Sequence, residues 1–236
     1  QSLLNTISEG FTGETNPKTL YFIEKAVNRV AEAKEIISDL LDYELYSQNQ
    51  PTTQEEFDIV VLVNSLVNRY ASRAAEEDIS LLADLPLHSK LVVSGDRRGL
   101  EHALRNIIEN AIKYTPEQGK VTITLNASET EKVCQINVID TGYGIPENER
   151  ETIFDPFYRS MKHKSNISGT GLGLPIAKRV ITNHNGTITV TSQENKGTTF
   201  SITLPYTKLT KIEKQAVERK KVIIIGSQKF DSGRSC

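Results

Sequence analysis

Cysteine is scarce in this chain of 236 residues, and tryptophan is absent. The two cysteines, Cys134 and Cys236, lie far apart and lack the close spacing of metal ligands. The sequence therefore indicates neither a disulfide scaffold nor a zinc site, and a reducing, cytoplasmic compartment is expected. It also lacks a secretory signal and an apolar run long enough to span a bilayer, so we expect no membrane segment in this chain.

A large excess of charge of one sign is missing as well. The chain has 28 basic and 30 acidic residues, which give a formal net charge of −2. Because a dedicated nucleic-acid-binding protein is typically strongly basic, no nucleic-acid partner is expected. The length suits one large domain, or a compact domain with an added helical element. The apolar pattern is already under way at Gln1, so we expect the chain to be part of a longer protein.

Residues 1–48 show the spacing of amphipathic helices. Asn16 is placed to cap a helix that has Pro17 in its first turn. A heptad-like apolar stripe then follows at Ile23, Val27, Val30, Ile37 and Leu41. One helix cannot bury such a stripe alone, so we expect a hairpin that pairs with a second chain. The alternative is a helix packed on its own domain. The polar residues 49–56 are predicted to form a linker.

Residues 57–207 mix helical and strand patterns without strict alternation. Helical spacing covers 59–71, 98–113 and 174–183, and Asp96 is a candidate cap for the second of these helices. Strand patterns occur within 79–93 and over 121–125, 134–139, 187–191 and 199–204. This order predicts an α+β fold, a two-layer sandwich of helices on a mixed sheet.

The C-terminal tail, residues 208–236, has two distinct parts. Residues 208–221 are charged and helix-like, whereas the apolar run 221–226 has the composition of a buried strand. The run is either the start of a truncated domain or a strand added to a sheet.

The first candidate motif is LRNIIENAIKYTP, Leu104 to Pro116. Asn106 and Asn110 are four residues apart, so both amides leave the same face of the predicted helix. Amide carbonyl oxygens suit Mg²⁺, a hard cation that shares phosphate oxygens. Lys113 is placed to reach a phosphate as a point charge. The alternative is that the asparagines only solvate a helix surface.

The second motif is INVIDTGYGIP, in which a strand delivers Asp140 and is followed by Gly142 and Gly144. A carboxylate there can accept a hydrogen bond from an exocyclic amine, and glycines let the backbone approach a flat base. An ordinary turn after a strand is the alternative.

The third motif is IFDPFYR, Ile153 to Arg159, in which aromatic side chains surround a proline. Aromatics can anchor a mobile loop, and Arg159 beside them can bind phosphate in a bidentate manner. A small aromatic cluster with no ligand explains the same pattern.

The fourth motif, GTGLGL, places glycines at 169, 171 and 173 before a predicted helix. A dinucleotide fingerprint requires a different glycine spacing directly after a strand, so that interpretation fails. Backbone N–H groups and the amino end of a helix favour a phosphate instead.

These four stretches, in this order, resemble the ATP-binding domain of sensor histidine kinases: the asparagine box, the first glycine box, the phenylalanine box and the second glycine box. Gly197 to Phe200, leading to Pro205, is similar to the closing strand of that domain. The resemblance covers about residues 57–205. The preceding helices resemble the dimerisation and phosphoacceptor hairpin of the same family.

The resemblance implies the Bergerat-type ATP-binding fold of gyrase, the heat-shock chaperone and the mismatch-repair ATPases. ATP is then expected between the asparagine helix and a lid at about residues 155–172. By position, Asn110 is expected to hold Mg²⁺, with Asn106 close by. Lys113 and Arg159 are expected to contact phosphates, and Tyr114 to border the nucleotide.

Asp140 is expected from the resemblance to hydrogen-bond the adenine amino group. The remaining residues expected to shape the ATP pocket are Gly142, Gly144, Ile145, Phe157, Gly169, Thr170, Gly171, Leu172, Gly173, Leu174 and Thr199.

The resemblance also implies an activity: phosphoryl transfer from ATP to a histidine, followed by relay to a response regulator, in a homodimer. Hydrolysing relatives carry a glutamate where this chain has Asn106, which cannot act as a base. Glu109 is the remaining candidate base. None of His88, His102 or His184, nor His163, has the setting of the family's acceptor. The chain alone is therefore not expected to phosphorylate itself, and a degenerate pseudokinase that acts as an ATP-binding docking module is the alternative. An ATP-hydrolysing relative is a third, less favoured possibility.

Overall fold

The computed structural model describes residues 16–47, 54–160, 169–211 and 222–224. In chain order their elements are α2 (Pro17–Ser47), β1 (Glu55–Asp58), α3 (Ile59–Glu76), β2 (Ser80–Asp84), β3 (Ser89–Gly95), α4 (Arg97–Lys113), β4 (Lys120–Ser128), β5 (Val133–Asp140), the 3-10 helices η1 (Glu147–Glu149) and η2 (Thr152–Phe154), α5 (Gly173–Asn183), β6 (Thr187–Gln193), β7 (Gly197–Pro205), β8 (Lys208–Lys211) and β9 (Val222–Ile224).

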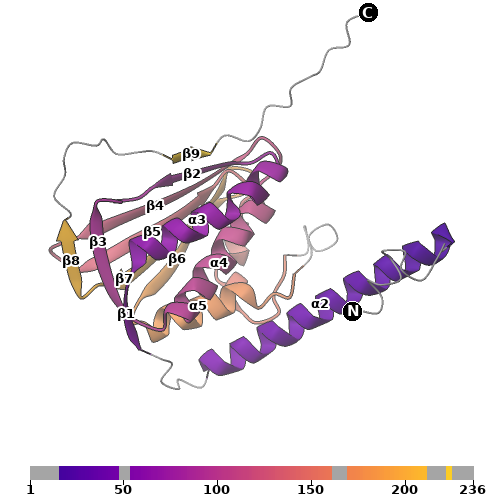
Figure 1. The fold of residues 1–236 in the computed structure, drawn as a ribbon, viewed down its shortest axis with the longest axis horizontal. Helices are drawn as coiled ribbons and strands as arrows, with labels where there is room; N and C mark the ends of the chain where they lie inside the picture. The colour runs from indigo at the N-terminus through magenta and orange to yellow at the C-terminus, as the bar shows by residue number, and fades with distance from the viewer. Residues whose placement is uncertain (1–15, 48–53, 161–168, 212–221, 225–236) are drawn as a thin grey trace, which may run out of the picture.

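The main sheet has six strands in the order β6-β7-β5-β4-β2-β9. It is mixed, because β2 and β4 run parallel whereas the other neighbours are antiparallel. A smaller sheet, β1-β3-β8, lies beside it. Helices α3, α4 and α5 cover one face of the main sheet (Figure 1). The predicted α+β class, helices layered on a mixed sheet, is confirmed.

The two-residue period of the strands creates the core. In β4 and β5 the side chains that face the helices are almost fully buried, and their neighbours in sequence are more exposed; the buried set is Val121, Ile123, Leu125, Cys134, Ile136 and Val138. Alternate residues of a strand point to opposite faces, so the pattern fixes which face packs on the helices.

Helix α4 carries the asparagine motif and is fixed from two sides. Its apolar face is buried through Leu100, Leu104, Ile107, Ile108 and Ala111. Each fully buried leucine or isoleucine contributes about 2 kcal/mol of hydrophobic stabilisation. At its start the Asp96 carboxylate accepts a hydrogen bond from the Gly99 N–H at 3.0 Å, as the sequence predicts for an N-cap. Because this face is locked in the core, the opposite face is held towards a cavity.

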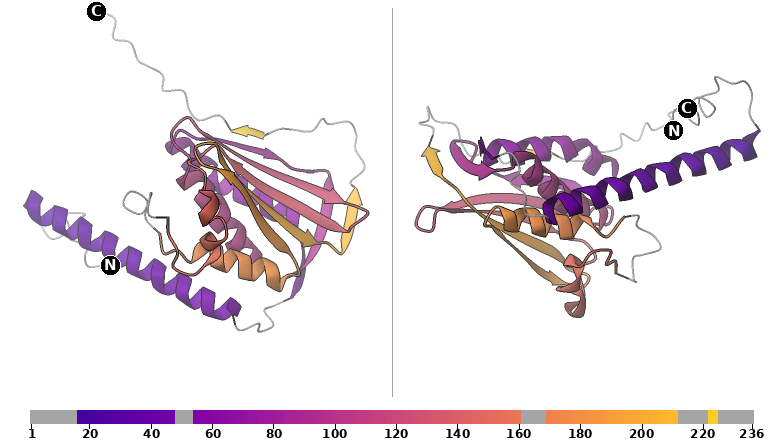
Figure 2. Two further views of the ribbon diagram at one scale, coloured as in Figure 1. Left: turned by 180° about the vertical axis from the view of Figure 1, so that it is seen from behind. Right: turned by 90° about the horizontal axis from the view of Figure 1, so that it is seen from below.

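Helix α2 extends well beyond the sandwich at its amino-terminal end (Figure 2). Asn16 caps it, since its side chain accepts from the Lys18 N–H at 2.9 Å. Its carboxyl-terminal half docks on the domain: Tyr46 is buried, and its carbonyl accepts a 3.1 Å hydrogen bond from the Asn183 amide. The expected apolar stripe is largely exposed. The helical pattern in residues 1–15 lies outside the described residues.

The sheets extend past the limits expected for the ATP-binding domain. The expected linker ends inside β1, which pairs with β3, and the expected helix over 208–221 is wrong at its start, because residues 208–211 form β8. Pairing with the open edge of β3 and packing of Leu209 on the core outweigh the helical propensity of this charged stretch. Residues 222–224 pair with the edge of β2, so this run is a strand added to the sheet.

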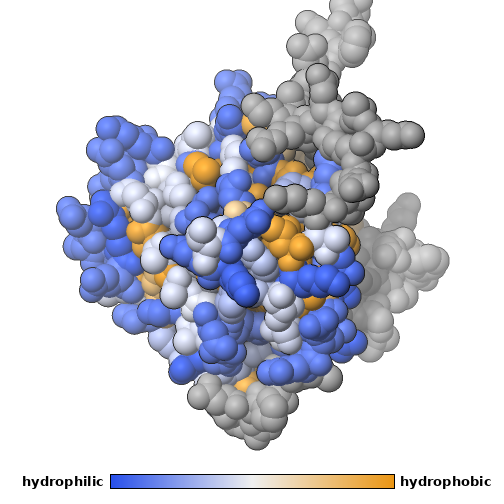
Figure 3. Space-filling view, turned by 90° about the vertical axis from the view of Figure 1, so that its left-hand side faces the viewer, coloured by the Kyte–Doolittle hydropathy of each residue, from blue (hydrophilic) through white to orange (hydrophobic). Residues whose placement is uncertain are grey.

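The surface on the side of β8 and β3 is largely hydrophilic, with scattered apolar patches (Figure 3). Within the described ranges, no helix combines the length and the apolar character needed to cross a membrane.

Candidate nucleotide site

A cavity of about 940 Å³ opens between α4, the segment after β5, the glycine loop and α2. Its volume lies near the upper end of the range of about 300–1,000 Å³ that ligand pockets show. Most residues expected at the ATP site line it: Asn106, Glu109, Asn110, Lys113, Tyr114, Asp140, Gly144, Ile145, Arg159, Gly169, Thr170, Gly171, Gly173 and Leu174. The four motifs are far apart in sequence, and the fold brings all of them to one cavity.

The wall from α4 presents two amides and a cation. Asn106, Asn110 and Lys113 lie on neighbouring turns and line the cavity together, as their spacing predicts. The Asn106 amide donates a hydrogen bond to the carbonyl of Gly173 at 3.1 Å. This bond joins α4 to the first turn of α5, so the amino end of α5 borders the cavity. Backbone N–H groups at such an end favour anions.

Asp140 is a buried carboxylate with defined partners. It is 6% exposed, and its Oδ1 accepts from the N–H groups of Gly142 at 2.8 Å and Thr198 at 3.1 Å. Burial raises the pKa of Asp140 to about 6, although the two N–H donors act to lower it. No other described residue hydrogen-bonds this carboxylate, so Oδ2 is available to a ligand. A single available acceptor in the cavity lining suits an exocyclic amine.

The backbone after β5 is held in a shape that needs glycine. Gly144 has φ +68°, and a Cβ there would lie 2.1 Å from the Gln193 carbonyl oxygen. The next residue, Ile145, donates its N–H to the Ser192 hydroxyl at 2.8 Å. Gly142 lies behind the cavity wall, where a Cβ would meet the Tyr114 carbonyl oxygen at 2.3 Å. These contacts hold the backbone after β5 close to the cavity.

The glycine loop is tied down at two points. Gly171 has φ +75°, and its carbonyl accepts from the Phe157 N–H at 3.0 Å. The Thr170 hydroxyl accepts from the Leu172 N–H at 3.1 Å and donates to the Asp39 carboxylate of α2 at 2.6 Å. The glycine loop therefore contacts both the aromatic motif and α2.

Three side chains expected at the site do not line the cavity. Phe157 is 61% exposed, and its backbone has φ +65°. Leu172 is fully buried in the core. Thr199 belongs to the opposite face of the sheet from Thr198 and Phe200, since successive strand residues alternate. Gly142, described above, acts through the backbone and the Asp140 carboxylate.

Other lining residues were not expected from the sequence. Thr198 and Phe200 line the cavity in place of Thr199. The sequence contains a signal for this position. The even-numbered residues of β7 include the apolar Ile202 and Leu204, so alternation predicts that Thr198 and Phe200 share their face. From α2 the lining includes Lys34 and three others, namely Ala31, Ser38 and Asp39. No local pattern could have placed that helix against the cavity.

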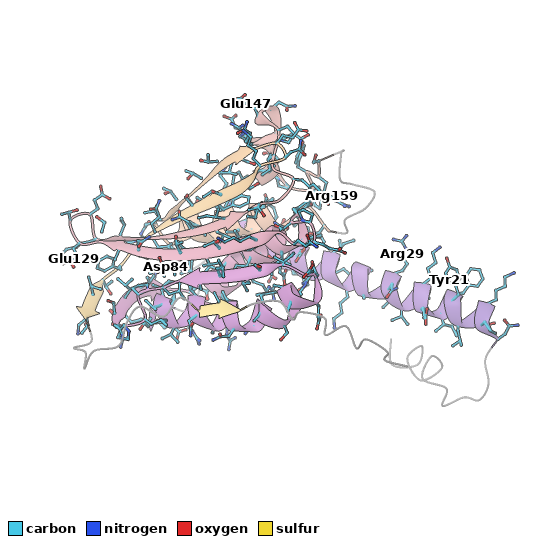
Figure 4. All side chains as sticks on the ribbon, turned by 90° about the horizontal axis from the view of Figure 1, so that it is seen from above. Tyr21, Arg29, Asp84, Glu129, Glu147 and Arg159 are labelled. Atoms are coloured by element: carbon cyan, nitrogen blue, oxygen red, sulfur yellow. The ribbon has the colours of Figure 1, made fainter. Side chains whose placement is uncertain are left out.

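The aromatic motif anchors the segment that precedes the lid. Phe154 packs edge-to-face on Phe200, with ring centroids 6.4 Å apart, and the Lys178 ammonium lies 5.1 Å from the Phe154 centroid. Burial raises the pKa of the Tyr114 hydroxyl, and the charge of Arg159 opposes that rise, so these two cavity residues lie near each other. Figure 4 shows Arg159 on the side of the domain that faces α2. The central lid, residues 161–168, lies outside the described residues.

The residues of the cavity suit a metal ion that binds together with the phosphates of a nucleotide. Within the described part of the chain, no group of three or more His, Cys, Asp or Glu side chains could form a metal site. The oxygen donor expected for Mg²⁺ is the carbonyl of Asn110, which lines the cavity. One amide oxygen fits Mg²⁺ when waters and phosphate oxygens complete its shell.

Residues 95–208 match the family model for the histidine kinase-, DNA gyrase B- and HSP90-like ATPases. Sensor histidine kinase WalK of Bacillus subtilis (strain 168) is 35% identical over 208 residues, which cover 87% of this chain and 34% of WalK. The chain thus spans about a third of the length of this relative.

Solved structures agree in fold. The mycobacterial sensor histidine kinase MprB matches with a TM-score of 0.55 and 28% identity, covering 65% of this chain and 98% of that one. Histidine kinase ThkA in complex with response regulator protein TrrA matches with a TM-score of 0.62 and 26% identity, covering 86% of this chain and 58% of that one. With four motifs gathered at one cavity, this chain contains the ATP-binding domain of the sensor histidine kinase family.

Proposed function

We propose that this chain is the catalytic part of a sensor histidine kinase that binds Mg²⁺-ATP and donates the γ-phosphate to a histidine. The observation that carries the proposal is that Asn110 and Asp140 line the same cavity, although they come from different elements. The two side chains provide an oxygen donor for the metal and an acceptor for adenine.

The proposed nucleotide lies along α4. The adenine amino group donates to the Asp140 carboxylate, between Thr198 and the backbone near Gly144. The phosphates lie against the glycine loop and the amino end of α5. Lys113 and Arg159 neutralise phosphate charge. Bound Mg²⁺, held by Asn110, supplies charge neutralisation for phosphoryl transfer, which depends mostly on positioning and electrostatics.

The residues around Asn106 favour transfer over hydrolysis. Its amide is a neutral group that donates to Gly173, so it cannot take a proton from water. Glu109 lines the cavity beside Asn110, and its carboxylate accepts a hydrogen bond from the Tyr70 hydroxyl. We propose Glu109 as the group that assists the acceptor imidazole.

The acceptor histidine is proposed to come from outside this sequence. His102 lies 3.3 Å from the Asp42 carboxylate at the α2 contact, and His184 accepts from the Asp96 N–H at 2.8 Å. Both imidazoles thus have structural partners. His163 lies outside the described residues.

We further propose a homodimer and a response regulator as partners. The α2 residues Ile37 and Leu41 are 59% and 65% exposed, which supports a second helix packed on this face. The support for a regulator is the likeness to ThkA, which was solved with its response regulator protein. The proposed division of the chain is a helical segment at 1–48, a short linker, the ATP-binding domain and a tail.

Calorimetric titration with Mg²⁺-ATP tests the proposal. The parent chain is expected to bind, whereas Asn110→Asp and Asp140→Ala variants are expected to bind at least tenfold more weakly, the loss of one charged or metal-linked contact. Variants that bind as tightly as the parent contradict the site.

A second experiment tests the transfer. A helical hairpin that carries the family's acceptor histidine is added with radiolabelled ATP. Label on that histidine supports the kinase, whereas ATP binding without transfer identifies an ATP-dependent docking module. Steady release of phosphate without acceptor contradicts a kinase that waits for a histidine.

A further inference from the structure

One part of the cavity lining, called the charged end below, consists of charged side chains from three helices. We define this charged end as the pairs Lys34 and Asp39 of α2, Arg73 and Glu77 of α3, and Arg105 and Glu109 of α4. It contains three cations and three carboxylates. The pairing of these groups decides what the charged end can bind.

All three carboxylates already have partners. Glu77 accepts from the Arg73 guanidinium at 3.2 Å, within one helix. Glu109 accepts from the buried Tyr70 hydroxyl, and Asp39 accepts from the Thr170 hydroxyl at 2.6 Å. Arg73 is therefore matched by Glu77 in its own helix.

Two cations remain. Among the described residues, no carboxylate lies within ion-pair distance of Arg105 or Lys34. The Arg105 Nε is buried and has no hydrogen-bond partner. Its charge acts to lower the pKa of both Tyr70 and His102, so the guanidinium lies close to both. A partly buried guanidinium without an anion is unfavourable, and an anionic ligand removes that cost.

We infer that Arg105 and Lys34 bind the terminal phosphate of the nucleotide, and that α2 is thereby part of the nucleotide site. The inference rests on the proposed function. Arg105 adjoins Asn106, which is bonded to the first turn of α5, where the phosphates are proposed to lie. The guanidinium plane matches phosphate oxygens in a bidentate manner, and Lys34 adds a point charge from the facing helix. The site therefore distinguishes a triphosphate from a diphosphate.

Calorimetry with the full chain and Mg²⁺ tests the inference, with a non-hydrolysable ATP analogue and ADP as probes. Arg105→Gln and Lys34→Gln are each expected to weaken binding of the analogue about tenfold, the effect of one charge-assisted hydrogen bond. Binding of ADP is expected to change less than twofold. Arg105→Lys is expected to recover part of the loss. The matched controls are Arg98→Gln on α4 and Lys18→Gln on α2, both exposed and outside the cavity lining.

The outcomes separate the inference from the proposed function. A parent chain that binds neither nucleotide defeats the proposed function. A parent chain that binds both, with variants that lose equal affinity for the analogue and ADP or lose none, overturns the inference alone. If Arg105→Gln unfolds at a lower temperature than the parent, Lys34→Gln decides, because Lys34 is exposed on α2 and replacing it leaves the core intact.

Discussion

The Asp140 side chain is buried, yet its proposed role in binding a ligand requires an ionised carboxylate. Its pKa is about 6 in the folded chain, against 3.8 as the ordinary value. Between these two pH values the folded state binds a proton that the unfolded state has lost, so stability falls as pH rises from about 4 to about 6. The difference corresponds to about 3 kcal/mol at neutral pH. The candidate site thus lowers the stability of the domain in order to present a carboxylate to a ligand.

Asp140→Asn is expected to stabilise the nucleotide-free chain by about 2 kcal/mol at pH 7, because the neutral amide avoids the cost of a buried charge. The gain is expected to shrink as the pH falls and to approach zero at about pH 3, below both pKa values, where Asp140 is mostly protonated in both states. Urea denaturation across this pH range measures both. Asp84→Asn at the exposed end of β2 (Figure 4) is the control and is expected to change stability by less than about 0.5 kcal/mol. A gain that persists unchanged at pH 4 contradicts this explanation.

Nucleotide affinity is expected to fall as pH drops below about 6. Protonation of the free Asp140 carboxyl, whose pKa is about 6, removes the acceptor for the adenine amine. From pH 7 to pH 5 the loss is about tenfold, as expected for one titrating group. Titration of ADP at several pH values measures it, since ADP carries the same base. Equal pH dependence in Asp140→Asn would assign the effect to another group.

The residues of the site could be predicted where helical spacing or strand alternation determines which face a side chain lies on. Asn106, Asn110 and Lys113 share a helical face, and Asp140 ends a strand, so their convergence follows from short-range rules. The prediction for Thr199 differs from the structure, because the two-residue period of β7 places Thr198 and Phe200 on the cavity face and Thr199 on the other. The contribution of Lys34 depends on the docking of a separate helix, which no local pattern encodes.

At the scale of elements, the connection between the glycine loop and the aromatic motif is backbone to backbone. The Phe157 N–H donates to the Gly171 carbonyl, and a Cβ on Gly171 would lie 2.8 Å from the Phe157 carbonyl carbon and the Tyr158 carbonyl oxygen. Both segments must move if either does. The positive φ of Gly171 adds a conformational reason for glycine at this position.

Gly171→Ala is expected to destabilise the chain by about 1–2 kcal/mol and to weaken ATP binding at least tenfold, because the loop must shift away from Phe157. Thermal unfolding and calorimetry with Mg²⁺-ATP provide the two readouts. Unchanged affinity in a variant of normal fold would show that the loop geometry does not matter for the nucleotide.

Elements with strong internal periodicity were predictable, and those made by distant pairing were not. The helix at 98–113 and the strands at 121–125 and 134–139 agree with α4, β4 and β5 within a few residues. β8 was mistaken for a helix, because its conformation depends on pairing with β3 across more than a hundred residues of sequence. Its charged side chains are compatible with a helix or a strand, so pairing with the edge of β3 determines the conformation.

At the scale of the whole molecule, α2 leaves a large apolar surface uncovered. Six of its aliphatic side chains are more than 40% exposed: Val30, Ile36, Ile37, Leu40, Leu41 and Leu45. A soluble protein rarely leaves such a stripe open, so a partner helix is expected to cover it.

Replacing Ile37 and Leu41 together by glutamate is expected to weaken self-association at least tenfold, because charges then enter the proposed helix interface. Sedimentation of the full chain over a range of concentrations measures the change. Lys18→Glu on the same helix is the control, since it also adds negative charge but lies outside the stripe. A parent chain that is monomeric at every concentration contradicts the proposed homodimer.

The hydrogen bond from Thr170 to Asp39 joins a loop beside the nucleotide cavity to a helix whose far end projects from the body. A coupling free energy between two sites acts equally in both directions. If bound ATP strengthens the contact between the loop and α2 by some factor, then holding α2 in that contact raises the affinity for ATP by the same factor. A twist applied at the distant end of α2 would then reach the cavity as a change in occupancy, and a filled cavity would resist that twist by the same free energy.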